Sequence, residues 1–217
     1  MLKTVLFDLD GVLVDSHFLH YKSWKMLAEY LNLKLTETQA DAFRGMAREE
    51  CMRVMFEKFN NQTAPNIEEI DRLTTMKNNW YLEILNNANP SDLIIDGAVE
   101  LLEELKSKNI KCLIASGSKN AKQVINCAKL NSYFYDVIDR HAIKITKPNP
   151  EIFLLALERA GAEKNEAVGV EDALLGIESL KAAGIKSVGI GHYATTADLH
   201  LSSIKNLNYN VLCSILK

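Results

Sequence analysis

The chain has 217 residues, of which 47% are hydrophobic and 24% charged, and its formal net charge is −3. This length suits one domain, or one domain with an insertion, and the composition excludes a disordered chain. The slight acidity argues against a protein that holds nucleic acid through bulk charge. No stretch approaches the roughly 18 apolar residues of a membrane helix. The four cysteines are scattered, with no C-x-x-C pair, which indicates a reduced, cytoplasmic protein.

The first predicted element is a short buried strand, Val5-Leu6-Phe7, which runs into the acidic turn Asp8-Leu9-Asp10-Gly11. The segment that follows, 16–91, contains no convincing strand. It predicts helices at roughly 17–31, 36–43, 48–59 and 67–85. Thr36 is a candidate N-cap for the second of these, with Glu37 in its first turn. We interpret this segment as a helical cap inserted after the first strand.

From about residue 92 onward, predicted helices and strands alternate. We expect strands at 111–115, 167–170 and 187–190, and helices at 98–108, 119–130, 150–160 and 174–183. This order predicts an α/β fold with a parallel, doubly wound, Rossmann-like core built from 1–15 and 92–217, and a helical cap formed by 16–91. Because ligands of open α/β sheets bind at the carboxyl ends of the strands, the polar residues there are expected to form one site.

Two carboxylates, Asp8 and Asp10, follow the first strand and face the same way on an extended chain. Like charges held together need a cation, and an all-oxygen ligand set suits Mg²⁺. Glu171-Asp172, at the end of another predicted strand, can complete that site. An EF-hand fragment does not fit, because Val12 stands where that loop needs an oxygen ligand. A plain acidic turn would not need apolar strands leading into both acidic pairs.

Two weaker features suit an anion. Ser116 ends a predicted strand, and the backbone N–H groups and hydroxyls of Gly117-Ser118-Lys119-Asn120 precede a predicted helix. Ser118 also suits the N-cap of that helix, and both roles are compatible. Lys147 precedes Pro148 and can reach a phosphate as a point charge. Taken alone, however, a lysine of this kind is more commonly exposed.

Four features, taken in chain order, resemble the haloacid-dehalogenase-like phosphotransferase superfamily. They are Asp8-x-Asp10-Gly11, Ser116, Lys147-Pro148 and Glu171-Asp172. The resemblance covers almost the whole chain. Further matches fall in the helical segment and point to the β-phosphoglucomutase subgroup of that superfamily. They are Asp15-Ser16, His20, Trp24-Lys25, Gly45-x-x-Arg48-Glu49 and Lys77-Asn78. Without this resemblance, His20 would be interpreted as a surface or interface histidine. Trp24 is expected to lie in the core of the cap.

The resemblance implies that Asp8 is the nucleophile and becomes an aspartyl phosphate. It implies that Asp10 is the general acid and base toward the sugar hydroxyl, with its backbone carbonyl bound to Mg²⁺. Asp172 would be a direct Mg²⁺ ligand supported by Glu171. The remaining residues implied to bind phosphate or substrate are Ser116 and Lys147 at the transferring phosphate, Arg48, Ser118, Lys119 and Asn120 at the distal phosphate, His20 and Lys77 gating the cap, and Gly45 and Gly117 in the binding loops.

The implied activity is Mg²⁺-dependent interconversion of β-D-glucose 1-phosphate and glucose 6-phosphate through a 1,6-bisphosphate. The implied partner is a small-molecule sugar phosphate, with no nucleic acid and no membrane, and the expected state is a monomer. Ala47 and Ala173 stand where the family often has Ser or Thr, and Gly117 replaces a more usual Ala. These departures bear on the identity of the sugar more than on the phosphotransfer chemistry.

Two alternatives remain. The first is a sugar-phosphate phosphatase on the same scaffold, in which water takes the phosphoryl group from Asp8. The second is a non-catalytic binding protein, which is disfavoured because Asp8, Asp10, Lys147 and Asp172 are all present.

Overall fold

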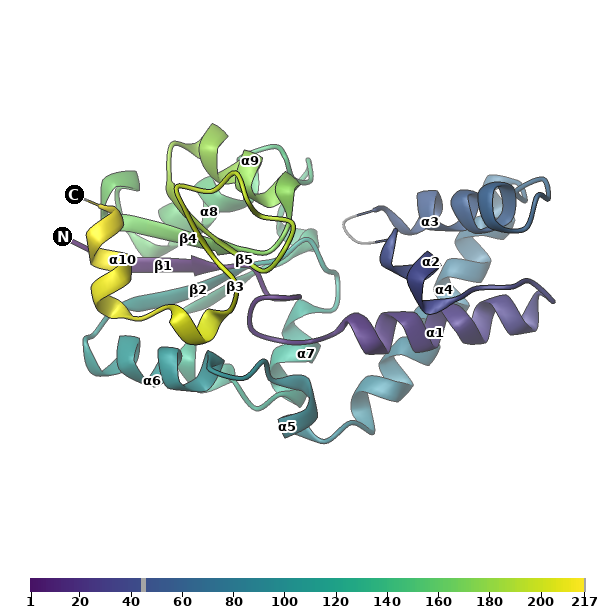
Figure 1. Ribbon diagram of the computed structural model, residues 1–217, viewed down its shortest axis with the longest axis horizontal. Helices are drawn as coiled ribbons and strands as arrows, with labels where there is room; N and C mark the ends of the chain where they lie inside the picture. The colour runs from purple at the N-terminus through teal and green to yellow at the C-terminus, as the bar shows by residue number, and fades with distance from the viewer. Residues whose placement is uncertain (44–45, 217) are drawn as a thin grey trace. The chain divides into compact units, whose positions relative to one another are not determined.

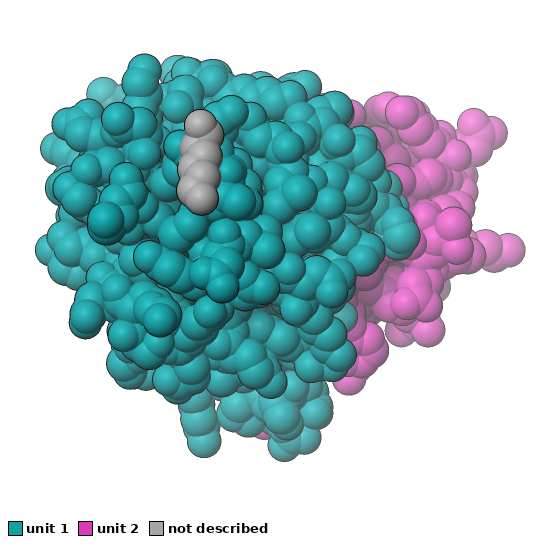
Figure 2. Space-filling view, turned by 60° about the vertical axis from the view of Figure 1, so that its left-hand side comes forward, with its two compact units in different colours: residues 1–15, 89–217 teal, residues 16–88 magenta. Residues whose placement is uncertain are grey.

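The computed structural model describes residues 1–43 and 46–216. It divides the chain into two compact units, shown in different colours in Figure 2. Unit 1 consists of Met1–Asp15 and Asn89–Lys217, and unit 2 of Ser16–Ala88. The sequence analysis expects the core as 1–15 and 92–217 and the helical cap as 16–91, while the compact units change at 15/16 and 88/89.

Unit 1 contains a six-stranded parallel sheet in the order β3-β2-β1-β4-β5-β6 (Figure 1). The strands are β1 (Thr4–Phe7), β2 (Lys111–Ala115), β3 (Asp136–Ile138), β4 (Ala167–Glu171), β5 (Lys186–Ile190) and β6 (Leu199–Leu201). This arrangement confirms the predicted parallel α/β fold. The sequence did not predict β3 and β6, because each is three residues long and mostly only partly buried, so neither carries an apolar run.

Helices cover both faces of the sheet in unit 1 (Figure 1). They are α5 (Pro90–Leu93), α6 (Ala98–Ser107), α7 (Ala121–Cys127), α8 (Glu151–Ala160), α9 (Leu174–Ala183) and α10 (Tyr209–Ile215), with the 3₁₀ turns η2 (Asn131–Tyr133), η3 (Arg140–Ala142), η4 (Lys164–Glu166) and η5 (Ile204–Asn206). On one face, Leu6 and Leu113 of the sheet pack with Phe153 of α8 and Ile177 of α9 in one buried cluster. Gly184 ends α9 in the left-handed conformation, as predicted.

The predicted start of the helix at 119 is wrong. Asn120 occupies the N-cap position of α7, which begins at Ala121. The Ser118 hydroxyl accepts a hydrogen bond from the Asn120 N–H at 3.1 Å, so it shapes the turn before the helix instead of capping it.

Unit 2 is helical, as predicted. Its elements are α1 (His17–Tyr30), α2 (Glu37–Asp41), α3 (Arg48–Val54), the π-helical turn η1 (Met55–Phe59) and α4 (Ile67–Asn86). Thr36 caps α2 in a reciprocal capping box with Gln39, which confirms the predicted N-cap. The core of the unit contains Trp24, as expected, together with Phe43 and Met52. None of the described helices is long and apolar enough to cross a membrane.

Candidate active site

Three polar strand ends meet in unit 1 because β1 lies between β2 and β4. Phe7 pairs with Ile114 on one side and with Val170 on the other, so the residues that follow these strands start at the same edge. The Asp8 N–H donates to the Val170 carbonyl at 2.9 Å and extends the ladder by one residue. Asp8 and Glu171 are thereby held at the carboxyl edge of the sheet, where a ligand site is expected.

A carboxylate cluster forms at this edge. Asp8, Glu171 and Asp172 each offer an oxygen atom, and these atoms all lie within 4.8 Å of one another. The Lys147 ammonium lies between two of them, with Nζ 2.6 Å from Asp8 Oδ1 and 2.5 Å from Glu171 Oε1. Its side chain is only 13% exposed, so the interpretation as an ordinary exposed lysine is wrong.

The negative charge of this cluster is incompletely balanced. Burial, with the charges of Asp8, Glu171 and Asp10, raises the pKa of Asp172 to about 8. Burial also raises the pKa of Glu171, despite the opposing effect of Lys147. For Lys147, burial lowers the pKa, but the Asp8 and Glu171 carboxylates outweigh it and raise the pKa overall. An all-oxygen set with surplus negative charge fits a hard divalent cation such as Mg²⁺.

Two glycines make room for these carboxylates. Gly11 has φ +83°, and a Cβ there would lie 2.0 Å from Asp172 Oδ2. A Cβ at Gly176, in the first turn of α9, would lie 1.8 Å from Glu171 Oε1. The Glu171 carboxylate also accepts the N–H groups of Asp172 and Ala173, at 2.9 and 3.0 Å. The position of Glu171 is therefore fixed from several sides.

The loop after β2 presents polar groups at the same edge. Ser116 is buried, and its hydroxyl accepts the Ser118 N–H at 3.1 Å, as the Ser118 hydroxyl accepts that of Asn120. As acceptors in these bonds, both hydroxyls keep a proton to donate to an anion. A Cβ at Gly117 would meet no atom within 4 Å, and Lys119 is exposed. The loop therefore has the donors that a phosphate needs.

Unit 2 holds a separate cationic cluster. Lys77 of α4 is 1% exposed, and its Nζ lies 3.0 Å from His20 Nδ1 of α1. The ammonium also lies 4.9 Å from the ring centre of Trp24 and 5.2 Å from that of Tyr81, which stacks on His20 at 4.4 Å. Cation–π contacts of this kind partly replace the water that a buried ammonium loses.

Burial and mutual repulsion shift the titration of this cluster. Burial, followed by the charge of Arg48, lowers the pKa of Lys77 to about 7. Burial, followed by Lys77 and Arg48, lowers the pKa of His20 well below its usual range. Burial also lowers the pKa of Arg48. These groups are therefore short of an anion, which is the electrostatic state expected of an anion-binding cluster.

Within unit 1 the structure brings Asp8, Glu171, Asp172 and Lys147 together, and within unit 2 it brings Lys77 next to His20. Gly45 lies outside the described residues, and Asp10 is not a member of the three-carboxylate group, although its charge acts on Asp172. The sequence analysis missed Tyr81. The signal available was the spacing of four residues from Lys77 on one helix, which matches the spacing from His20 to Trp24 on the other.

Fold and strand-end carboxylates together define an α/β enzyme with its site at the edge of a parallel sheet. A model of the haloacid dehalogenase-like hydrolases matches residues 2–184, and the chain belongs to that family. Beta-phosphoglucomutase of Bacillus subtilis (strain 168) is 32% identical over 190 residues, which cover 88% of this chain and 84% of that protein. A phosphorylated carbohydrates phosphatase of Thermotoga maritima is 30% identical, over 88% of this chain and 86% of its own length.

The similarity extends to solved structures. A 2.27 Å crystal structure of beta-phosphoglucomutase from Clostridium difficile matches with a TM-score of 0.87 and 31% identity. The match covers 100% of this chain and 97% of that one. Both units of this chain therefore have counterparts in that relative.

Proposed function

We propose that this protein is a Mg²⁺-dependent phosphoglucomutase that interconverts β-D-glucose 1-phosphate and glucose 6-phosphate. The observation that carries the proposal is the presence of two separate groups suited to phosphate. One surrounds the Asp8 carboxylate in unit 1, and the other surrounds Arg48 and Lys77 in unit 2. A 1,6-bisphosphate intermediate has two phosphates and needs both.

The chemistry is assigned to Asp8. Its carboxylate attacks the phosphorus, the bond from phosphorus to the donor sugar oxygen breaks, and an aspartyl phosphate forms. Lys147 already touches Asp8 and is placed to hold an equatorial phosphate oxygen, together with the Ser116 hydroxyl. Asp8, Asp172 and the Asp10 carbonyl, with support from Glu171, would hold Mg²⁺, which would neutralise charge at this phosphate. Asp10 passes a proton to or from the sugar oxygen.

The second phosphate is assigned to Arg48 of unit 2. Ser118, Lys119 and Asn120, with Gly117, are assigned to phosphate or substrate binding in unit 1, and Gly45, outside the described residues, keeps its assignment to substrate binding from the resemblance. A guanidinium can hold a phosphate through two parallel hydrogen bonds, and Arg48 carries that geometry. His20 and Lys77, which lie side by side in unit 2, are assigned to the gating role that the resemblance gives the helical cap.

A sugar-phosphate phosphatase is the second candidate. It is favoured by the 30% identity to the Thermotoga maritima phosphatase of phosphorylated carbohydrates. The two reactions share Asp8 and differ in whether a sugar phosphate or water accepts the phosphoryl group.

One assay separates the two. The protein is given Mg²⁺, β-glucose 1-phosphate and a trace of glucose 1,6-bisphosphate, and glucose 6-phosphate and free phosphate are followed together. Glucose 6-phosphate forming well ahead of phosphate is the expected result. Phosphate alone would establish the phosphatase instead. Asp8→Asn should lose both products while keeping its circular dichroism spectrum, and retained turnover in that variant would remove the covalent mechanism.

A further inference from the structure

The backbone that carries Lys147 belongs to neither a strand nor a helix. The Lys147 ammonium must stay between Asp8 and Glu171, yet it extends from an irregular segment between η3 and α8. A lysine has four rotatable side-chain bonds, so its head group is only as well placed as the backbone that carries it. The contacts that hold the segment 143–150 therefore decide where the ammonium lies.

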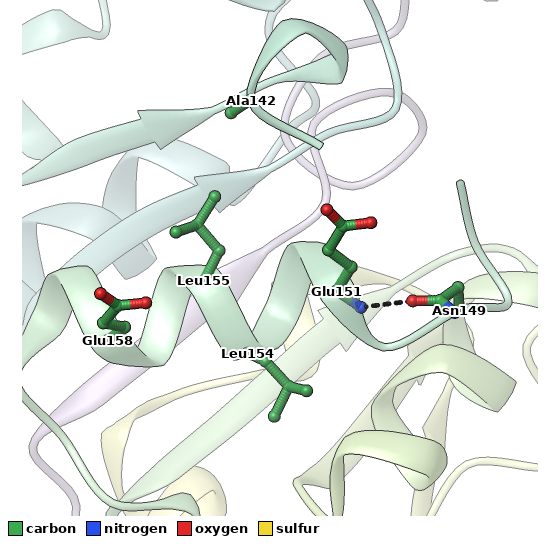
Figure 3. Close-up of a pocket in the computed structure, with 6 residues that line it drawn as sticks. All are labelled: Ala142, Asn149, Glu151, Leu154, Leu155 and Glu158. Carbon is green, nitrogen blue, oxygen red and sulfur yellow. Dashed lines mark hydrogen bonds between the residues drawn. The ribbon is translucent and has the colours of Figure 1, made fainter. Parts of the chain in front are cut away.

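One set of contacts ties the segment to the start of α8. The Glu151 carboxylate accepts the N–H groups of Lys144 and Ile145 at 2.9 and 2.8 Å. Asn149 Oδ1 accepts the Glu151 N–H at 3.0 Å, drawn as the dashed line in Figure 3. Asn149 and Glu151 also line an open depression of about 450 Å³. Water therefore competes for these bonds, which lowers what each contributes.

A second contact is of a different kind. Ser179 of α9 is fully buried, and its hydroxyl donates to the Asn149 carbonyl at 2.7 Å, 30 positions away in the sequence. Asn149 follows Lys147 by two residues, so the bond fixes the backbone close to the catalytic side chain. Because the donor is fully buried, no water stands beside it to take its place, and removing the hydroxyl detaches the Asn149 carbonyl from α9.

The same helix also positions the partner of the lysine. Gly176 gives space to the Glu171 carboxylate, and Ser179 lies three residues later, on the same side of α9. We propose that Ser179 is a positioning residue that sets the Lys147 ammonium against the reacting phosphate by anchoring the Asn149 carbonyl to α9. This inference rests on the proposed function, in which Lys147 binds the transferring phosphate.

The test compares Ser179→Ala with Ser187→Ala. Ser187 is also a fully buried serine with a hydrogen-bonded hydroxyl, but its partner is Asp198 and it lies near the start of β5, not at the catalytic edge. Two readouts are used: kcat for glucose 6-phosphate formation, and the Mg²⁺-dependent affinity for orthovanadate by calorimetry. Orthovanadate takes the place of a transferring phosphoryl group and requires no sugar.

In Ser179→Ala we expect both kcat and vanadate affinity to fall about twofold to tenfold, the scale of one hydrogen bond. Ser187→Ala should lose thermal stability without either change. Ser179→Cys, which keeps a weak donor of similar size, should fall between wild type and Ser179→Ala. In a Lys147→Ala background, Ser179→Ala should have no further effect on vanadate affinity, because the group it positions is gone.

Unchanged vanadate affinity in Ser179→Ala, or equal losses with and without Lys147, would overturn the proposal. If Ser179→Ala does not fold, the same comparison is made with Ser179→Cys. If wild type binds vanadate but forms no glucose 6-phosphate, the mutase proposal fails while the role of Ser179 is still decided by vanadate binding.

Discussion

Replacing Lys77 with Met should remove a pH dependence of stability that is confined to unit 2. Lys77 is 1% exposed, and burial together with Arg48 lowers its pKa from 10.5 to about 7. In the unfolded chain the ammonium has its ordinary pKa. Between about pH 7 and 10 the unfolded state therefore holds a proton that the folded state has lost, and stability rises with pH across that window.

The size of the effect follows from the shift. At about 1.4 kcal/mol per pKa unit, carrying a protonated Lys77 costs the folded state about 5 kcal/mol at low pH. Between pH 7 and 9, the gain in stability is about 2 kcal/mol, because Lys77 is half protonated at the start of the interval. Two neighbouring groups have little effect over most of this window. The lowered pKa of His20 acts below about pH 6.5, and Cys51, whose pKa burial raises from its ordinary value near 9 to about 12, begins to oppose the gain only as pH approaches 9.

Both tryptophans of the chain, Trp24 and Trp80, lie in unit 2, so their fluorescence reports the unfolding of that unit. Urea unfolding at pH 7 and pH 9 should show the gain in wild type and in Lys58→Met, a control at an exposed position of the same unit. The gain should be absent in Lys77→Met. An equal gain in all three proteins would refute the assignment of the low pKa to burial of Lys77.

Three further predictions concern the two groups of charged residues. Gly176→Ala should lower kcat at least tenfold, because the new Cβ displaces the Glu171 carboxylate. The helix propensity of Ala alone would instead give a more stable protein with unchanged kcat, and that result would contradict the prediction. Lys147→Met should destabilise unit 1 by about 3–5 kcal/mol, since it leaves buried carboxylates without their ammonium. Millimolar Mg²⁺ should restore part of that loss in thermal unfolding, and no response to Mg²⁺ would count against a metal at this cluster. Arg48→Lys should raise the ratio of free phosphate to glucose 6-phosphate, because an ammonium lacks the two-pronged geometry of a guanidinium, and an unchanged ratio would place the distal phosphate elsewhere.

The sequence predicts an element of the fold wherever that element has a local pattern, such as an apolar run or a glycine at its end. β1, β2, β4 and β5 are buried apolar runs, and α9 ends at a glycine, so each could be recognised locally. β3 and β6 became strands only through pairing with β2 and β5, and their residues carry no such pattern. The start of α7 is misplaced because the bond from the Asn120 N–H to the Ser118 hydroxyl belongs to a turn that precedes the helix, and α7 begins only at Ala121.

The site shows the same division. The pairs Asp8/Asp10 and Glu171/Asp172 can be recognised from the sequence, because each directly follows an apolar strand. Lys147 cannot, because a lysine before a proline has no local sign of burial, and its environment is supplied by residues 139 and 24 positions away. Ser179 is less visible still. Its role depends on the packing of α8 against α9 and on a single carbonyl, neither of which leaves a pattern in the sequence.

The two buried lysines show how one side-chain type acquires two electrostatic states. Lys147 lies among carboxylates, which raise its pKa and keep it charged at any physiological pH. Lys77 is buried among aromatic rings and lies near another cation, and its burial and the charge of Arg48 lower its pKa until it loses its proton near neutrality. A phosphate bound at Lys147 finds a permanent positive charge, whereas one bound near Arg48 and Lys77 would raise the pKa of Lys77 and draw a proton onto it. On the proposed function, the catalytic phosphate site is therefore charged in advance, and the distal site gains its full charge only when a phosphate arrives.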